Sequence, residues 1–225
     1  MTGRAEHGHR KPAMLLKWIS CDVTDAAVFD VDQRRWAAAL RGIPGFLAQG
    51  GGWSRRLPNA AHVFAFWDSE RSHARFMAHE HDEIVASHRE SWAGITVRTF
   101  LHRFDIGRPA RPTFSDATVL RVAHCRVHPD RVEHFVAAQA GVWNPGMGAC
   151  AGLRRGVFAQ AGESTFLVLS MWRSVADHES YLDGPFAELR ARAGVASDLA
   201  EMSGHLVDIE PAWSVSVPPA ATSAP

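Results

Sequence analysis

The chain has 225 residues, of which 46% are hydrophobic and 21% are charged, and its formal net charge is +0. This length allows one large domain or two of about 100 residues. The charge balance disfavours proteins that bind nucleic acid or anionic membranes through a basic surface, and no run of residues approaches the ~20 apolar residues of a membrane span. We therefore expect neither nucleic acid nor membrane as a partner.

The first half of the chain predicts the element order β-α-β-β-α-β. Thr24 or Asp25 can cap a helix before a periodic apolar stretch, Gly42 and the Pro44-Gly45 pair end that helix, and Ser69 caps a second one. Strands are expected at 14–23, 46–56, 62–67 and 94–104, and helices at 26–40 and from 70 to about 91, with a break near His79.

The second half predicts the same order after a linker at 105–116 that is rich in Gly and Pro. Its strands are expected at 118–127, 150–160, 165–172 and 204–209, and its helices at 129–143, 175–182 and 185–200. The run Asn144-Pro145-Gly146 is expected to end the first of these helices. The predicted domains are 14–104 and 117–213, and residues 1–13 and 214–225 are expected to be disordered.

The two halves also repeat each other in sequence. The segment 15–23 returns as 119–127 with Cys21 aligned to Cys125, an offset of 125 − 21 = 104. The residues Trp67, Ser69, His73 and Phe76 return as Trp172, Ser174, His178 and Tyr181, an offset of 172 − 67 = 105. Two copies are too few for a solenoid, so they indicate two small units that pack on each other.

Each unit has the ferredoxin-like plan, in which two helices cover one face of a four-stranded sheet. The other face carries apolar side chains that need a cover. In the first unit these are Trp18, Phe64 and Phe66, and in the second Val122, Leu169 and Met171. We predict an α+β protein of two tandem ferredoxin-like repeats that close into an intrachain dimeric α+β barrel.

Cysteine and histidine positions give no sign of a disulfide framework or a metal site. The spacing of Cys21, Cys125 and Cys150 fits neither a disulfide framework nor a metal site. This use of cysteine favours a reducing cytoplasm. The thirteen histidines are scattered. We expect a cytoplasmic protein with no metal and no cofactor.

Residues 14–101 resemble the YdbC-like domain family. The resemblance rests on Leu16-Lys17-Trp18-Ile19, Gly45-Phe46-Leu47, Gly51-Gly52-Trp53 and His81-Asp82-Glu83-Ile84. The second repeat resembles the broader antibiotic-biosynthesis-monooxygenase-like superfamily through Trp172, Ser174, His178 and Tyr181. The resemblance implies a dimeric α+β barrel, formed here within one chain, and it brings no known reaction.

Haem-degrading members of that superfamily carry an Asn on the first strand and a Trp and a His on the second helix. Here the strand has no Asn, the Trp position holds Phe76 or Tyr181, and the His position falls near Ala86 or Ala191. Haem binding is therefore the weakest of the functions that the resemblance suggests.

Polar residues of the first repeat are the candidates for chemistry. Lys17 lies within an apolar strand, so it either holds an anionic or carbonyl group of a ligand or forms an ion pair. Gln49 and Trp53 flank the glycines 50–52, where the indole either stacks on a planar ligand anchored by Gln49 or packs at the rim of the barrel. Trp18, Phe64 and Phe66 are expected to line the substrate-binding interior.

His81 lies in the densest cluster of titratable residues, beside Asp82 and Glu83. It is either a general acid or base or a surface histidine paired with an acid. Lys17 and His81 are the candidate catalytic residues, so the first repeat is expected to carry the site.

We therefore expect a small-molecule-binding barrel that acts as a cofactor-independent oxygenase or isomerase on an aromatic or polyketide-like substrate. The alternatives are a non-catalytic ligand-binding or stress-related protein and a haem-binding protein. The expected partners are a small-molecule ligand and a second copy of the fused pseudodimer.

Overall fold

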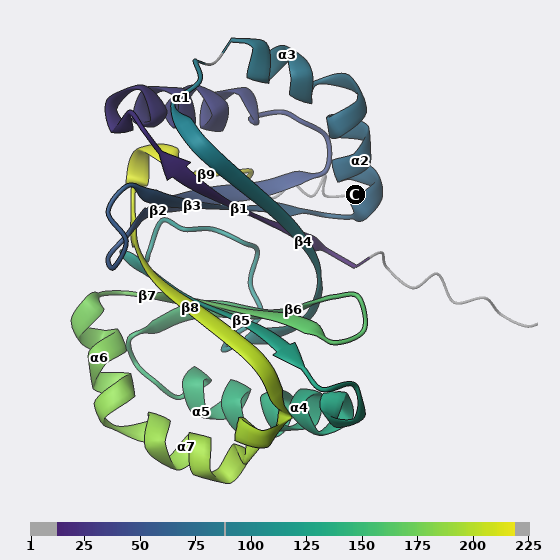
Figure 1. Cartoon of the computed structure of the whole chain (residues 1–225), viewed down its shortest axis with the longest axis vertical. Coiled ribbons are helices and arrows are strands. Elements are labelled where there is room, and N and C mark those ends of the chain that lie inside the picture. The colour runs from purple at the N-terminus through teal and green to yellow at the C-terminus, as the bar shows by residue number, and fades with distance from the viewer. Residues whose placement is uncertain (1–12, 88, 219–225) are drawn as a thin grey trace, which may run out of the picture.

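The computed structural model describes residues 13–87 and 89–218, which form two β-α-β-β-α-β units (Figure 1). The first unit comprises β1 (Leu15–Val23), α1 (Ala26–Ala39), β2 (Phe46–Ser54), β3 (Ala60–Trp67), α2 (Glu70–His79), α3 (His81–Ala86) and β4 (Trp92–Ile106). Each expected strand and helix of this unit is present, and the break near His79 separates α2 from α3. The described helices are each too short or too polar to cross a bilayer.

The second unit has the same order with additional short helices. It comprises β5 (Val119–Val127), η1 (Pro129–Arg131), α4 (Val132–Ala138), η2 (Gln139–Trp143), α5 (Asn144–Gly148), β6 (Leu153–Ala161), β7 (Thr165–Trp172), α6 (Val175–Asp183), α7 (Pro185–Ala193), η3 (Val195–Asp198) and β8 (Leu199–Ile209). The chain continues through η4 (Pro211–Trp213) into β9 (Val215–Ser216).

Several expected boundaries were wrong, and three of them have a clear physical cause. Asn144-Pro145-Gly146 does not end a helix, because Pro145 lies in the first turn of α5, where its missing N–H costs nothing. The helix expected to reach residue 200 ends at Ala193, since Gly194 adopts a left-handed conformation (φ 62°) and β8 already starts at Leu199. The segment from residue 214, which was expected to be disordered, starts with ordered residues, because β9 pairs with β2 beside the fully buried Trp213.

Antiparallel pairings join the strands into one continuous set. The order is β4-β1-β3-β2 in the first unit and β8-β5-β7-β6 in the second. Residues 101–106 of β4 pair with β6, and residues 52–54 of β2 pair with β8. The pairings of β1–β8 therefore return to their starting point, and we call this arrangement the strand ring. Helices lie outside it at both ends of the view in Figure 1.

Side chains from both units fill the interior of the strand ring. Trp18 stacks on Phe64 with ring centroids 6.0 Å apart, and Phe66 packs in the same cluster with Leu120 and Val122 of the second unit. A cavity beside Phe66 has a volume of only about 10 Å³, which is close to the space of one water. The interior is therefore a packed core.

The segment between the units is part of this core. β4 extends to Ile106, and Phe114 is 2% exposed with its ring 6.0 Å from that of Phe66. Phe114 also lies so close to Gly50 that a Cβ there would meet its ring at 2.3 Å. The expectation of a plain linker at 105–116 thus missed Phe114, whose side chain packs inside the strand ring.

Candidate functional site

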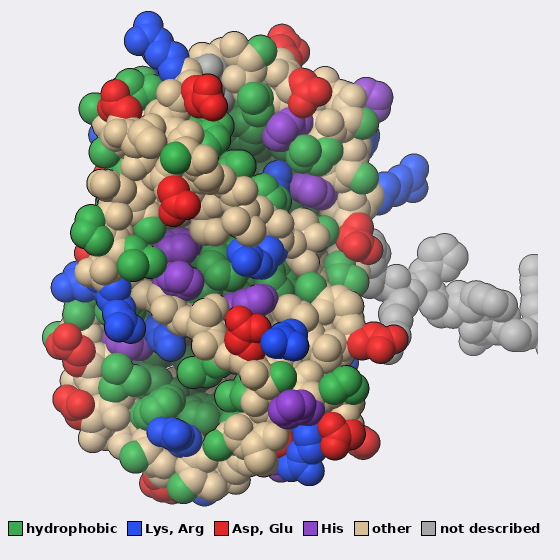
Figure 2. Space-filling model, viewed as in Figure 1, with side chains coloured by type: hydrophobic (Ala, Val, Ile, Leu, Met, Phe, Trp, Pro, Cys, Tyr) green, Lys and Arg blue, Asp and Glu red, His purple; other side chains and the backbone are tan. Residues whose placement is uncertain are grey.

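A cavity of about 420 Å³ lies between the sheet and the helices of the second repeat. We call it the helix-side pocket. Figure 2 shows it as a hollow lined by hydrophobic side chains between the regions of α6, α7 and α4. Apolar walls come from Phe135, Trp143 and Phe186 among others. The polar residues that line it are Arg121, Cys125, Gln139, His178, Tyr181 and Arg190.

Arg121 forms the charged part of the floor. In β5 alternate residues face opposite sides, so Leu120 and Val122 enter the strand ring while Arg121 faces the helices. Its guanidinium donates to the backbone oxygens of Val122 and His205, and among the described residues it has no acidic partner. Burial lowers the pKa of Arg121. A half-buried guanidinium that lacks a carboxylate partner suits an anionic or carbonyl oxygen of a ligand.

Glycine makes room for this side chain. A Cβ at Gly204 of β8 would lie 2.4 Å from Nη1 of Arg121. The guanidinium therefore crosses the sheet over a position where any other residue would displace it.

His178 and Tyr181 come from one face of α6, three residues apart. They are 4% and 6% exposed. Burial, and then the nearby Arg121, lower the pKa of His178 to about 4, so its imidazole is neutral at pH 7. Neither ring nitrogen has a hydrogen-bond partner among the described residues. Burial raises the pKa of Tyr181, which is protonated at neutral pH.

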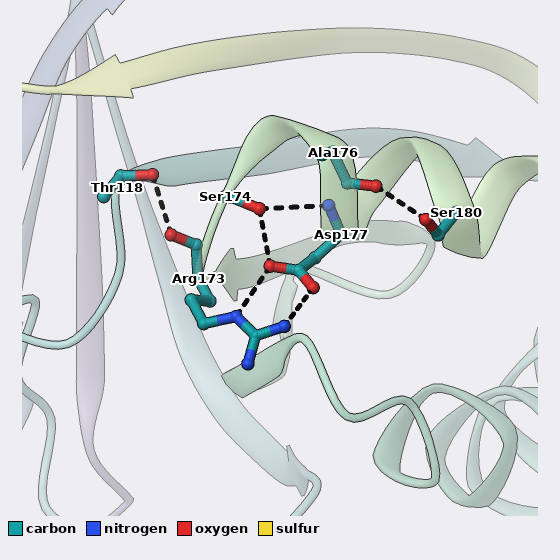
Figure 3. A network of polar contacts seen from close by, with 6 residues as sticks. All are labelled: Thr118, Arg173, Ser174, Ala176, Asp177 and Ser180. Atoms are coloured by element: carbon teal, nitrogen blue, oxygen red, sulfur yellow. Dashed lines mark hydrogen bonds and ion pairs between the residues drawn. The ribbon is translucent and has the colours of Figure 1, made fainter.

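A polar network fixes the start of α6 (Figure 3). The Ser174 hydroxyl accepts from the backbone N–H of Asp177 at 3.1 Å, and the Arg173 guanidinium holds the Asp177 carboxylate at 2.9 and 2.5 Å. Thr118 donates to the carbonyl of Arg173 at 2.9 Å and so ties the helix start to β5. This network sets the position of His178, one residue further along the helix.

A π-helical turn supplies the facing wall. Gln139 is 4% exposed, and its amide donates to the Asn144 side chain at 2.7 Å. Asn144 in turn donates to the backbone oxygen of Asp105 at 3.3 Å. Gln139 and Trp143 begin and end this turn, η2, and both line the pocket. Single π-helical turns occur frequently at functional sites.

The predicted site residues do not meet in one place. Trp18, Phe64 and Phe66 face the interior of the strand ring, as expected, but they are packed in its core. Lys17 alternates with Leu16 and Trp18 and faces the helices of the first repeat, so it cannot hold a ligand within the interior of the strand ring.

Gln49 and Trp53 also face the helix side of the sheet. Gln49 pairs with Ala65, which packs under the helices, and Gln49 is fully buried. The ring of Trp53 lies 5.8 Å from that of Phe29 and 5.2 Å from that of Trp213, so it packs between α1 and η4. These contacts match the alternative in which Trp53 is a packing residue.

His81 starts α3 and bonds to its neighbour. Its Nδ1 lies 2.8 Å from Oδ1 of Asp82, and its ring lies 5.6 Å from that of Trp36. The helix-side pocket consists of residues of the second repeat alone. The expectation that the first repeat carries the main cavity was therefore wrong.

Some residues that line this pocket stand at positions that the alignment of the two repeats had already matched. Arg121 occupies the position of Lys17, and His178 and Tyr181 occupy those of His73 and Phe76. The sequence interpretation did not place His178 among the candidate site residues, because periodicity cannot show which of two similar units leaves space beneath its helices.

Comparisons with known proteins agree with this fold. Residues 15–100 match the family described as "Domain of unknown function (DUF4937)". Over 96 residues the chain is 29% identical to the uncharacterized protein YdbC of Bacillus subtilis (strain 168), which covers 41% of this chain and 80% of that protein. These matches confirm the resemblance to YdbC-like proteins.

Solved structures resemble nearly the whole chain. A proposed monooxygenase from Fusobacterium nucleatum superposes with a TM-score of 0.74 at 8% identity, covering 89% of this chain and 94% of that one. One from Lactobacillus acidophilus gives 0.71 at 11% identity, covering 91% and 96%. An anthrone oxidase-like protein gives 0.64 at 14% identity, covering 90% and 92%. The chain thus has the antiparallel α+β fold of monooxygenase-like proteins.

Proposed function

We propose that the chain is a small-molecule-binding α+β barrel of the antibiotic-biosynthesis-monooxygenase-like kind, with its site in the helix-side pocket of the second repeat. In this proposal the two repeats are a dimer fused into one chain, and the strand ring is the barrel of that dimer. The observation that carries the proposal is a half-buried guanidinium, Arg121, which has no acidic partner in the described part of the chain and lies beside a neutral His178 in a largely apolar cavity.

The substrate class follows from the chemistry of the lining. The aromatic rings of Phe135, Trp143 and Phe186 suit a planar aromatic or polyketide-like molecule. Arg121 suits an oxygen that carries developing negative charge. An anthrone has both features, since its CH₂ group is acidified by a carbonyl across the ring, and one of the structural relatives is described as anthrone oxidase-like.

The proposed reaction is a cofactor-independent oxygenation. His178 accepts a proton from the CH₂ group, and the electron pair moves onto the carbonyl oxygen, which Arg121 stabilises as an anion. The carbanion form reacts with O₂ to give a hydroperoxide after protonation. Loss of water then leaves a ketone, so the balance is R₂CH₂ + O₂ → R₂C=O + H₂O.

The test is oxygen uptake by the purified protein with anthrone, under air and under nitrogen. We expect anthraquinone to form under air only, and we expect Arg121→Met and His178→Phe to lower kcat/KM by at least about tenfold. Arg126→Met is the matched control, because Arg126 lies on the same strand and forms an exposed ion pair with Glu201; its activity should equal that of the parent.

Two results contradict parts of the proposal. Binding of anthrone that depends on Arg121 but gives no turnover identifies a non-catalytic ligand-binding protein. A stoichiometric Soret shift on titration with haemin, abolished by His178→Phe, identifies a haem-binding protein instead.

A further inference from the structure

The chain carries almost all of its positive charge on arginine. Of its 24 basic residues only two are lysines, Lys11 and Lys17. Lys11 lies outside the described residues. Lys17 lies in the middle of β1 and is 6% exposed. A lysine is rarely buried without a partner, so its surroundings require an explanation.

The amine of Lys17 has no carboxylate to neutralise it. Its one hydrogen-bond partner in the described part of the chain is the sulfur of Met77, at 3.7 Å, which is a weak acceptor. Among the described residues it forms no ion pair, so the ion-pair alternative for Lys17 is not observed. Burial lowers the pKa of Lys17 and thereby favours the uncharged amine, which is the nucleophilic form.

A histidine lies beside this amine. His73 precedes Met77 by one turn of α2, and its Nε2 is buried without a partner among the described residues. Burial, and then the charges of Lys17 and His81, lower the pKa of His73 to about 4. A neutral imidazole next to an amine can accept a proton and return it.

The amine also lies close to solvent. Met77, which contacts it, is 36% exposed, and methionine is unbranched and conformationally adaptable. A partly exposed and adaptable side chain is therefore what the amine contacts on the side of α2.

We propose that Lys17 is a carbonyl-capturing residue, which forms an imine with an aldehyde or ketone that enters beneath Met77. The amine nitrogen forms a bond to the carbonyl carbon and loses a proton to His73. His73 returns this proton to the alkoxide oxygen, and the hydroxyl so formed leaves as water with the second proton of the nitrogen, which is also transferred through His73. The balance is R–NH₂ + O=CR′₂ → R–N=CR′₂ + H₂O, and no oxidant or reductant takes part. The equivalent residue of the second repeat, Arg121, lacks a primary amine, so the two repeats differ in chemistry here.

The test is reductive trapping with benzaldehyde and sodium cyanoborohydride at pH 7, read by intact mass and peptide mapping. The amines that compete are those of Lys11 and the N-terminus. We expect Lys17 to acquire the benzyl group at least tenfold faster than Lys11 in the folded protein. In urea the two lysines should react at similar rates, because the advantage comes from the fold.

Three variants separate capture from simple burial. Lys17→Arg keeps the charge and should leave only slow labelling of the other amines. Met77→Ala should speed labelling of Lys17, and His73→Phe should slow it with no comparable loss in Tm. Labelling of Lys17 that is slower than that of Lys11 in the folded protein, and that Met77→Ala does not change, shows an inert buried amine and overturns the proposal.

Discussion

Three histidines, the buried His62 and His178 and the half-buried His73, show how burial of single residues couples folding to pH. Burial is the main cause that lowers the pKa of each to about 4, with further contributions from His205, Lys17 and Arg121 respectively. His62 also accepts a hydrogen bond from the indole N–H of Trp18 at 3.3 Å. The folded chain therefore holds these rings neutral where an unfolded chain protonates them.

We expect the free energy of unfolding to fall as the pH decreases from about 6.5 to about 4. In that window the unfolded state binds more protons than the folded state, while above it both states hold neutral rings and the effect vanishes. Each pKa unit corresponds to at most about 1.4 kcal/mol per group, and solvent screening around these partly accessible rings reduces the combined loss to the order of a few kcal/mol.

Urea unfolding measured at a series of pH values checks this expectation. His73→Leu should make the pH dependence less steep, whereas His128→Leu, at an exposed position, should leave it unchanged. An equal slope in the parent and in His73→Leu would contradict the assignment.

At the scale of one element, α6 joins stability to the helix-side pocket. Its first turn is held by Ser174, Arg173 and Asp177, and its next residues, His178 and Tyr181, line the cavity. The equivalent helix of the first repeat, α2, is capped by Ser69, which accepts from the N–H of Ser72 at 3.2 Å. The two serine caps are thus equivalent in the two repeats, but only the helix capped by Ser174 lines the helix-side pocket.

We expect Ser174→Ala and Ser69→Ala each to lower the free energy of unfolding by about 1 kcal/mol, the usual cost of losing an N-cap. Only Ser174→Ala should also weaken ligand binding in the helix-side pocket, because it loosens the turn before His178. Urea unfolding and a titration with anthrone measure the two effects. Equal ligand affinities in both variants would show that the cap does not position the pocket.

The elements were largely predictable from sequence, and the assembly of the site was not. Apolar alternation and caps such as Ser69 located the strands and helices, since these signals are local. Trp53 was ambiguous because its partners, Phe29 and Trp213, come from distant segments. The sequence left Lys17 between a ligand role and an ion pair, although its neighbours Leu16 and Trp18 in the core already place it on the opposite face of the sheet. The volume beneath α6 depends on packing, which one sequence does not reveal.

At the scale of the whole molecule, the strand ring depends on close contact between the units at β2 and β8. Gly52 pairs with Ile209, and a Cβ at Gly52 would lie 1.8 Å from the backbone oxygen of Asp208. This contact leaves no space for a side chain. The closure of the ring therefore rests in part on one glycine.

We expect Gly52→Ala to lower the free energy of unfolding by about 1–3 kcal/mol, because the backbone of β8 must move away. Gly141→Ala is the control: a Cβ there meets no atom within 4 Å, and alanine favours helix, so stability should be equal or up to about 1 kcal/mol higher. Thermal or urea unfolding of both variants decides. Equal stabilities would show that the closure at β2 and β8 tolerates a wider spacing.

The strand ring also separates an interior that both units share from two helix-side layers that each belong mainly to one unit. Its interior takes side chains from both units, so a change of volume there is felt by both and has to be compensated across the repeat boundary. The layer beneath α6 and α7 is built mainly from the second unit, with Phe104 and Ile106 of β4 added to it. The layer beneath α1 and α2 is built mainly from the first unit, with Val215 of β9 added to it. Most substitutions in one layer therefore leave the other undisturbed, so one frame can hold two helix-side layers that adapt to different ligands.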